Sequence, residues 1–443
     1  MPGPGSKSTR SPRVEPPPSF GASWRRRRIQ RRSCSPTQSR TSSPCSSATG
    51  NERSTDRTSS FANSASPRPL NRLEYILSAA VLRAVGWLAS WLPVSQRRVV
   101  LATARVPSLE GNLAYLHAAM RRLRPDLEYV LLLEPYSYGL AGKLGYLLRV
   151  IRGMVLLRTA RLFVVDNAYL PIHVAPHRPQ TTVVQVWHAV GALKRFGVDA
   201  ATPPDEPERT FLHRHYDYVV SAGEMARRPY ANALRTPVER VVPLGAPRTD
   251  FFFDPAAMAA AREQVLEAYP ALRGRRVVLY APTFRGRGRD KRAAPAFDAP
   301  ALRAALPQTD VLALKTHPNL DPATTPTAGF DVVIEPRLEI NEVLAATDVL
   351  VTDYSSSIFE WALLGRPLVL LIPDVEDYLE DPGLYLDPRT IAFASIVEDP
   401  ADLPAAIVGA RPDPAAARAF AATHIDACDG RAAARFVERF LAT

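Results

Sequence analysis

The segment DVLVTDYSSSIFE, which spans Asp348–Glu360, predicts the architecture of the whole chain. Its first part, Val349–Thr352, is a short run of β-branched and leucine residues, typical of a strand that is buried on both faces of a parallel sheet. A polar turn follows, and Ile358–Leu364 then has the composition of a helix that Gly365 ends. A strand, a polar turn and a helix in this order are typical of an α/β protein with a parallel sheet.

The same alternation extends in both directions, and it falls into two sets of predicted strands. The first set is Val99–Thr103, Tyr129–Leu133, Leu162–Val165, Val183–Val186, Tyr218–Ser221 and Val241–Leu244. The second set is Val277–Ala281, Val311–Lys315, Val332–Ile334, Val349–Thr352, Leu368–Ile372 and Ala392–Ile396. A helical segment within Phe253–Arg276 separates the sets. We therefore predict two Rossmann-like, doubly wound domains, residues 97–254 and 255–443, which face a cleft and carry ligand groups at the carboxyl ends of their strands.

Charge is distributed unevenly along the chain. The 443 residues carry a net charge of +11, of which residues 1–70 contribute +10 and residues 71–163 contribute +8, whereas residues 164–443 carry −7. Residues 1–70 are rich in Ser, Pro and Arg and poor in aliphatic side chains, so we predict a disordered tail. A start codon assigned too far upstream is the alternative. The body offers no basic aromatic groove, so we do not expect a nucleic-acid partner, although an Arg-rich tail keeps that hypothesis testable through its salt dependence.

Two segments of the basic first third are apolar enough to meet a membrane. Leu73–Leu92 predicts a helix of about five turns that carries Trp87 and Trp91. Its internal charges make a membrane span marginal, whereas the tryptophans suit a helix in the membrane interface. Lys143–Arg161 is a basic amphipathic segment that would be attracted to anionic lipid. We predict a membrane-associated helix within residues 71–96 and peripheral attachment to an anionic membrane surface; two ordinary packing helices are the alternative.

Two histidines follow predicted strands. His188 lies in QVWHAVGALKRFG, Gln185–Gly197, directly after a strand and before a basic segment that contains Lys194. Histidine titrates near neutral pH, so His188 can accept a hydroxyl proton, and Lys194 can contact phosphate. His317 lies before Pro318, which restricts it to an extended conformation at a strand end, where it can donate a hydrogen bond to a phosphoryl oxygen. Either histidine alone would as readily be structural.

Two further polar turns follow predicted strands, GAPRTD at 245–250 and YAPTFR at 280–285. The first can direct its charged side chains into the space between the domains, although a helix cap is the alternative. The second suits phosphate contact. The candidate residues in these turns are Arg248, Asp250, Thr283 and Arg285.

The turn that follows Val349–Thr352 is the strongest candidate site. Hydroxyls and backbone N–H groups at the start of a helix form an anion site, which the helix dipole strengthens. The candidate residues there are Thr352, Asp353, Ser355 and Ser356. Glu360, near the first turn of the helix, can accept from ribose hydroxyls. The alternative is a serine-rich helix cap.

Cofactor and metal signatures are missing from the sequence. Cys34, Cys45 and Cys428 cannot form a disulfide framework, and none has the spacing of a zinc site. The chain contains neither a GxGxxG fingerprint nor a P-loop. We therefore predict no cofactor and no metal, in a reducing cytoplasm.

Taken together, these stretches resemble the CDP-glycerol glycerophosphotransferase family, the teichoic acid primases and polymerases. The matching strings are QVWHAVGALKRFG, GAPRTD, YAPTFR, HP at 317–318 and TDYSSSIFE at 352–360. They occur in order between about Val155 and the C-terminus, each after a predicted strand. The resemblance implies a GT-B-like architecture, with the nucleotide donor in the C-terminal domain and the acceptor along the N-terminal one.

The resemblance also implies a reaction. An acceptor hydroxyl would attack the β-phosphorus of CDP-glycerol and expel CMP, with His188 as general base and with His317 and Arg285 offsetting the phosphoryl charge. Ser355 and Ser356 would bind the donor phosphates. Glu360 would serve donor binding too. The acceptor would be a lipid-linked molecule at the cytoplasmic face of the cell membrane.

One departure from the family pattern bears on the product. Ala189 follows His188, where the polymerases often have Gly, and this looks more like the shorter, primase-like members. Donor specificity drifts within the family, so CDP-ribitol or another nucleotide-linked unit stays open. A GT-B sugar or sugar-phosphate transferase for capsule or glycolipid synthesis, using the same histidines, is the alternative.

Overall fold

The computed structural model describes residues 72–133, 139–200, 212–286, 291–294, 297–317, 320 and 326–442. All of them belong to one compact unit, Ser64–Thr443. The predicted tail, residues 1–70, lies outside the described residues. Residues 287–290, which follow the YAPTFR turn, and Pro318 lie outside them as well.

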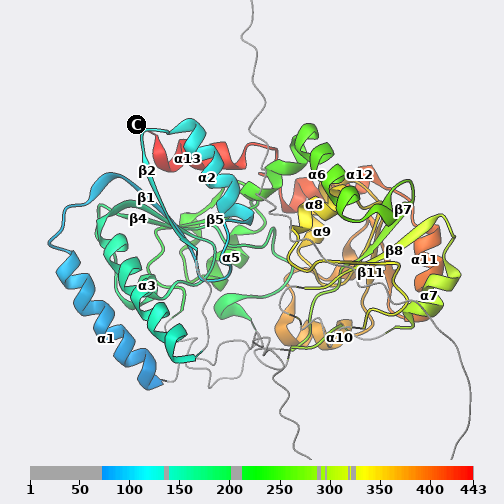
Figure 1. Cartoon of the computed structure of the whole chain (residues 1–443), viewed down its shortest axis with the longest axis horizontal. Helices are drawn as coiled ribbons and strands as arrows, with labels where there is room; N and C mark the ends of the chain where they lie inside the picture. Colours follow the sequence, from blue (N-terminus) through cyan, green and yellow to red (C-terminus); the bar gives the residue numbers. More distant parts are fainter. Residues whose placement is uncertain are drawn as a thin grey trace, which may run out of the picture. The chain divides into compact units, whose positions relative to one another are not determined.

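Six parallel strands form the sheet of the first half (Figure 1). They are β1 (Ser95–Thr103), β2 (Glu128–Leu133), β3 (Ala160–Val165), β4 (Thr182–Gln185), β5 (Tyr218–Ser221) and β6 (Val241–Pro243). Their order across the sheet is β2-β1-β3-β4-β5-β6, and each neighbouring pair is parallel. The winding reverses between β1 and β3, which makes that pair the topological switch point of the sheet.

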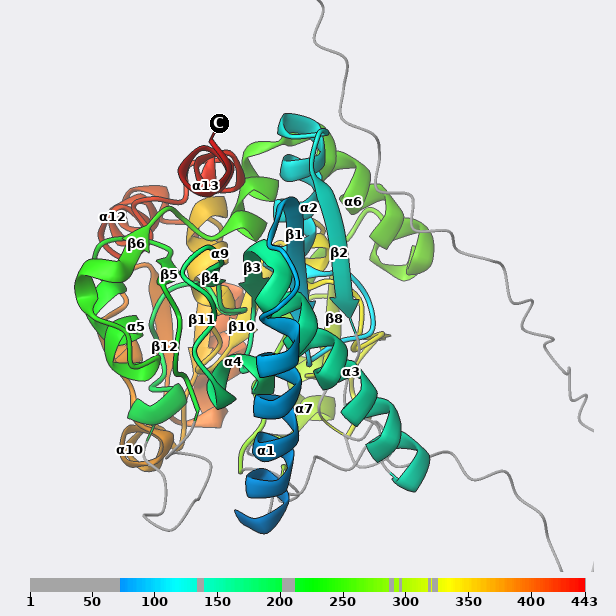
Figure 2. The ribbon, with the colours of Figure 1, turned by 90° about the vertical axis from the view of Figure 1, so that its left-hand side faces the viewer.

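Helices cover both faces of this sheet (Figure 2). They are α1 (Arg72–Ala89), α2 (Gly111–Leu123), α3 (Gly139–Thr159), α4 (Leu170–Val174) and α5 (Arg227–Ala233). Alternate residues of β1 point to opposite faces. Val100 belongs to the same buried cluster as Leu82 of α1 and Met154 of α3, whereas Leu101 packs in a cluster with Leu116 of α2.

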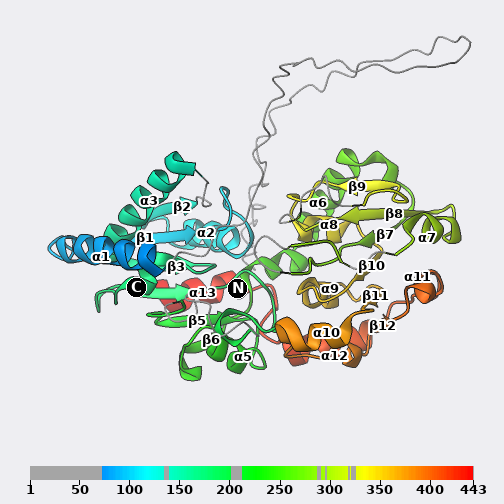
Figure 3. The ribbon, with the colours of Figure 1, turned by 90° about the horizontal axis from the view of Figure 1, so that it is seen from below.

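The second half repeats this architecture around another six-stranded parallel sheet (Figure 3). Its strands are β7 (Arg276–Tyr280), β8 (Asp310–Lys315), β9 (Val332–Ile334), β10 (Val349–Thr352), β11 (Leu368–Leu371) and β12 (Ala394–Val397). Its α-helices are α6 (Pro255–Ala268), α7 (Ala299–Ala305), α8 (Ile340–Ala345), α9 (Ser357–Leu364), α10 (Val375–Tyr378), α11 (Leu403–Gly409), α12 (Pro414–His424) and α13 (Ala432–Leu441). The order is β12-β11-β10-β7-β8-β9, so the switch point lies between β7 and β10.

The predicted strands are confirmed. Every strand of the described sheets overlaps a predicted run, and β5, β9 and β10 have the predicted bounds. The reason is that the inner strands are apolar and buried on both faces, as in β10, where all four side chains are buried, whereas the edge strands β2, β9 and β12 are partly exposed. The prediction of two doubly wound α/β domains is confirmed too.

The last helix, α13, packs against the first half although it follows the whole second sheet. Its residues Phe436 and Leu441 are buried in one cluster with Leu101 of β1 and Leu116 of α2. Figure 1 shows α13 beside α2. The core of the first half therefore includes residues that the predicted boundaries assign to the C-terminal domain.

Candidate functional site

Polar loops follow the strands at the switch points of both sheets. In the first half, Arg105 follows β1 and Asp166 follows β3, and the two side chains lie 3.7 Å apart. In the second half, the turns that begin at Ala281 and Asp353 follow β7 and β10. Ligands bind at such carboxyl ends in doubly wound sheets, so the predicted motifs occupy the positions where a site is expected.

The turn after β4 holds its backbone in an unfavourable conformation. Trp187 has a φ of 51°, in the left-handed region that non-glycine residues rarely adopt. Its N–H donates to Gln185 Oε1 at 2.8 Å, and its carbonyl accepts from Asn112 Nδ2 at 2.8 Å. These bonds fix the backbone immediately before His188.

His188 is oriented by a backbone carbonyl. Its Nδ1 lies 3.3 Å from the carbonyl oxygen of Asp166, which can only accept, so Nδ1 carries the hydrogen and Nε2 keeps its lone pair. Burial, with the charge of Arg105 as the next cause, lowers the pKa of His188 to about 3. The imidazole is therefore neutral at pH 7 and able to accept a proton.

His317 lies on the other side of the site. Its ring contacts Phe284 edge-on, with 4.8 Å between centroids. Burial lowers its pKa to about 4, and the next causes are the charges of Lys194, Lys291 and Lys315. His317 in turn contributes to the lowered pKa of His188, so the structure brings the two predicted catalytic histidines within electrostatic reach of each other.

Several residues near the histidines were not singled out from the sequence. They are Arg105, Asn112, Asp166, Lys291 and Lys315. Lys315 is the last residue of β8, two positions before His317, and its Nζ donates to the Pro336 carbonyl at 2.8 Å. Burial lowers its pKa to about 8. The sequence signal for Arg105 and Asp166 was their position directly after a strand. That signal did not distinguish Arg105 from the many other arginines in the first third of the chain.

The turns after β7 and β10 are joined by a buried ionic network. Asp353 accepts from the Thr283 N–H at 2.9 Å, from Thr283 Oγ1 at 3.1 Å and from Arg285 at 2.8 Å. Arg285 also pairs with Asp374 at 2.6 Å, and Asp374 accepts from Tyr354 at 3.0 Å. Burial opposes the charge of Arg285, but its bonds to Asp374 and Asp353 outweigh burial and raise its pKa. Thr283 and Arg285 thus bind protein carboxylates, and their predicted donor contact stays a prediction.

The serine turn lies at the start of α9, as predicted. Ser356 occupies the N-cap position without a capping side-chain bond, and Ser355 Oγ lies 2.8 Å from Ser357 Oγ. The Thr352 hydroxyl donates to the Ala281 carbonyl at 2.7 Å and ties β10 to the end of β7, and its predicted donor contact stays a prediction. The predicted anion site therefore rests on Ser355, Ser356 and the backbone of the turn.

Glu360, a candidate for donor binding, and Arg248, a candidate for contact with the acceptor or a phosphate, contact each other. The two side chains form an ion pair of 2.8 Å, and Glu360 is buried. Burial raises the pKa of Glu360, and the charge of Arg248 opposes that shift. Glu360 is buried on α9, which brings its carboxylate to Arg248, and its predicted donor contact stays a prediction.

The structure places Lys194 near a predicted catalytic histidine and Asp250 at the start of a distant helix. Lys194 lies near His317, and its Nζ is 5.3 Å from the ring centre of Tyr378. Asp250 accepts from the backbone N–H groups of Ala432 and Ala433, each at 2.9 Å, so both of its oxygens hold the start of α13. The helix-cap alternative describes Asp250, although the helix it binds lies far away in the sequence.

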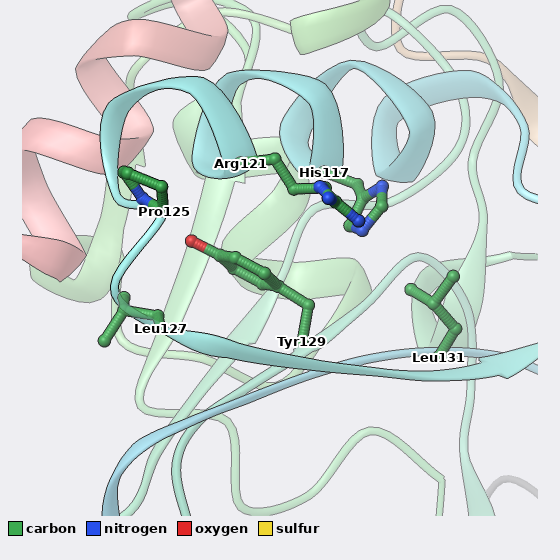
Figure 4. A pocket seen from close by; sticks show the side chains of 6 residues that line it. All are labelled: His117, Arg121, Pro125, Leu127, Tyr129 and Leu131. Atoms are coloured by element: carbon green, nitrogen blue, oxygen red, sulfur yellow. The ribbon is translucent and has the colours of Figure 1, made fainter.

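A pocket of about 340 Å³ lies away from these residues, between α2 and the edge strand β2 (Figure 4). It is lined by His117, Arg121, Pro125, Leu127, Tyr129 and Leu131. None of the predicted site residues lines it. Among the described residues, no group of three His, Cys, Asp or Glu side chains is placed to hold a metal ion.

Comparison with known sequences shows which protein family this chain matches. A model of the CDP-Glycerol:Poly(glycerophosphate) glycerophosphotransferase family matches residues 87–442. The teichoic acid ribitol-phosphate primase of Bacillus spizizenii is 33% identical over 371 residues, which cover 80% of this chain and 94% of that protein. The teichoic acid poly(ribitol-phosphate) polymerase of the same organism is 32% identical over 67% of this chain and 48% of its own length.

Among solved structures, the wall teichoic acid polymerase TagF is similar with a TM-score of 0.63 and 19% identity. The match covers 83% of this chain and 96% of that one. The two parallel sheets together with this match confirm the predicted GT-B-like fold.

Proposed function

The chain belongs to the CDP-glycerol:poly(glycerophosphate) glycerophosphotransferase family, and we propose that it transfers a polyol phosphate from a CDP-linked donor to a lipid-linked acceptor in teichoic acid or related cell-surface polymer synthesis. The observation that carries this proposal is the pair of neutral histidines, His188 and His317, with basic side chains around them from both halves. Such a site can remove a proton from a hydroxyl and bind a diphosphate.

The reaction is a single displacement at phosphorus. The acceptor hydroxyl gives its proton to Nε2 of His188 as its oxygen bonds to the β-phosphorus of the donor. The bond between that phosphorus and the bridging oxygen breaks, and the oxygen leaves with CMP. The tautomer of His188 that the Asp166 carbonyl selects supports its role as the base.

Charge develops on the phosphoryl oxygens and on the leaving phosphate, and basic groups stabilise it. Lys194, Lys291 and Lys315 face His317 closely enough to lower its pKa, so their positive charge is concentrated there. Ser355 and Ser356, with the N-terminus of α9, hold the donor phosphates. Catalysis of phosphoryl transfer depends on such positioning and electrostatic stabilisation.

The donor is CDP-ribitol or CDP-glycerol, and we rank ribitol first. The ribitol-phosphate primase of Bacillus spizizenii is 33% identical, whereas the glycerol-phosphate primase of Bacillus subtilis is 26% identical. This chain covers 94% of the ribitol-phosphate primase but 48% of the poly(ribitol-phosphate) polymerase. The comparison of lengths, with Ala189 after the motif histidine, supports the addition of one or a few units.

The enzyme works at the cytoplasmic face of the membrane, bound through α1 and α3. These helices pack side by side (Figures 1 and 2). Their exposed large apolar side chains, with those just after α1, are Ile76, Leu77, Val81, Trp87, Leu88, Trp91, Leu92, Leu144 and Leu148. No helix among the described residues is both long and apolar enough to cross a bilayer. An exposed Trp pair beside aliphatic side chains supports interfacial binding.

A donor panel tests the reaction. CDP-ribitol, CDP-glycerol and UDP- and GDP-linked sugars would be offered with a prenyl-diphosphate disaccharide acceptor, and nucleotide release and product size would be measured. We expect CMP release from a CDP-polyol and products with one or a few added units. Release from the UDP- or GDP-linked sugars alone would favour the sugar-transferase alternative.

Sedimentation with vesicles tests the location. Replacing Trp87 and Trp91 with Ser should weaken binding to phosphatidylglycerol vesicles about tenfold or more. Met225→Ser is the control, because Met225 is an exposed apolar side chain, about as exposed as Trp87, that lies outside α1 and α3. Equal binding by all three proteins would contradict the proposed surface.

A further inference from the structure

Arg248 lies where the two halves of the protein meet, in the 3-10 helix Pro247–Phe253. Its side chain is mostly buried, with 13% exposed. One guanidinium nitrogen donates to the carbonyl of His188 at 3.4 Å. The other contacts Glu360 at 2.8 Å and Asn341 Oδ1 at 3.1 Å, both in the second half.

The same residue is fixed through its backbone. The Arg248 N–H donates to Asn112 Oδ1 at 3.0 Å, and the amide of Asn112 donates to the Trp187 carbonyl at 2.8 Å. The Arg248 carbonyl accepts from Asn341 at 3.2 Å. Two successive carbonyls of the left-handed turn, those of Trp187 and His188, are thus held by Asn112 and Arg248.

The loop after His188 is attached to the second half as well. Lys194 forms an antiparallel bridge with Leu384, and the Tyr385 N–H donates to the Leu193 carbonyl at 2.8 Å. Gly191 has a φ of 67° and lies against the ring of Phe359, which leaves no room for a side chain. The backbone around His188 is therefore supported by the half that binds the donor.

From these contacts we infer that Arg248 is a positioning residue that sets His188 relative to the donor through its ion pair with Glu360. In this role the two side chains act through the backbone of His188, which Arg248 contacts at the carbonyl. The inference rests on the proposed function for its kinetic consequence, and it replaces the expectation that Glu360 contacts the ribose of the donor. Arg248 thus connects the carbonyl of His188 to α9, because it contacts that carbonyl and also Glu360, and α9 begins directly after Ser355 and Ser356.

Because the Arg248–Glu360 pair is buried, the position of His188 should be sensitive to the loss of either charge. Arg248 Nε and Glu360 Oε2 are buried without a hydrogen-bond partner among the described residues. Glu339 Oε1 also lies 3.4 Å from the nitrogen of Arg248 that contacts Glu360, so within the described part of the chain removal of the Glu360 charge leaves Arg248 with Glu339 alone, and removal of Arg248 leaves both carboxylates without their cation. A small shift of His188 is enough to disturb proton transfer, because catalytic geometry tolerates little displacement.

The test is a comparison of donor binding with turnover in Glu360→Gln, which keeps the shape and removes the charge. We expect kcat to fall about 100-fold while the Kd for CMP, measured by calorimetry, changes less than about threefold. Arg248→Ala should lose activity to a similar extent and regain at least about fivefold on addition of guanidinium ion, which a merely unstable protein would not do.

A readout that needs no activity separates this inference from the proposed function. The imidazole NMR signals of His188, assigned with His188→Gln, should shift in Glu360→Gln. Asp310→Asn is the matched control, because Asp310 is a buried partner of Arg276 at 2.8 Å and lies at the N-terminal end of β8, opposite the carboxyl end that leads to His317. It should leave those signals and kcat unchanged.

Two outcomes would overturn the inference. In the first, Glu360→Gln weakens CMP binding tenfold or more with unchanged kcat and His188 signals, which would make Glu360 a donor ligand. In the second, kcat, Kd and the His188 signals all stay at their original values. Absence of nucleotide release from any CDP-polyol by the unmodified enzyme would instead refute the proposed function, and the NMR comparison would still decide the role of Arg248.

Discussion

Two regions of the site use charge in opposite ways. In the turns after β7 and β10, Arg285 lies between Asp353 and Asp374, so a buried cation is matched by carboxylates within the same network. Around the histidines, the imidazoles are neutral because burial lowers their pKa, and the basic side chains beside them lower it further. The Arg285 network is neutralised within the protein and is therefore the part that holds its own shape, in the sense that it stabilises the fold. We propose that the basic surroundings of the histidines instead bind an anionic ligand.

The largest expected effect tests the reactive part. His188→Gln removes the lone pair at Nε2 but keeps the polar volume, and it should lower kcat by about 10²–10⁴-fold, with His317→Gln in the same range. Nucleotide release measures both. The midpoint of urea unfolding serves as the control for each variant. A loss below about tenfold in both variants would contradict the proposed mechanism.

The next effect tests the part that holds its own shape. Arg285→Met leaves two carboxylates facing each other and should lower the free energy of unfolding by about 3 kcal/mol. Arg273→Met, which breaks the exposed pair between Arg273 and Glu263, should cost less than about 0.5 kcal/mol. Urea unfolding measures both. Equal losses would remove the contrast between buried and exposed pairs on which the comparison depends.

Acid should destabilise the half that contains the buried histidines. Burial lowers the pKa of His173 to about 3 and that of His213 to about 4, below the unfolded value of about 6.5. Between pH 6.5 and about 4 the unfolded chain binds more protons, so stability falls as the pH falls, by about 1.4 kcal/mol per pH unit for each histidine. The thermal midpoint of His213→Gln should depend less on pH than that of the unmodified protein. Parallel curves would contradict this assignment.

Lys315 offers a smaller effect on the reactive side. Because its pKa is lowered to about 8, its charge is lost as the pH rises through that value, and kcat/KM should fall there. Lys315→Met should lower kcat/KM about tenfold at pH 7, the loss of one charge-assisted hydrogen bond to phosphate, and should remove the decline near pH 8. A pH–rate profile of both proteins measures this. An unchanged decline in the variant would assign it to another group.

The smallest effect concerns a hydroxyl that holds two strands together. Thr352→Val removes the bond to the Ala281 carbonyl and should destabilise the protein by about 1 kcal/mol without lowering kcat more than about twofold. Unfolding and CMP release measure the two quantities. A large fall in kcat would return Thr352 to the donor site, as predicted from the sequence.

The sequence was sufficient for features that depend on neighbours along the chain. Continuous apolar runs identify the strands because both faces of each sheet are covered, and the turn at Ser355 follows from the strand and helix that flank it. Partners far apart in the sequence were not accessible in this way. Asp250 binds the start of α13, and Glu360 binds Arg248, and in both cases a polar residue with a plausible local role is used by a distant element.

The position of α13 has a consequence for how the protein is made. Phe436 and Leu441 complete a core whose other members, such as Leu101 and Leu116, are synthesised more than 300 residues earlier. During translation, part of the apolar surface of the first half therefore stays exposed until the second half and α13 have emerged from the ribosome. Exposed surface of this kind favours misassembly, so the order of synthesis makes the first half dependent on chaperones or on rapid folding of the second.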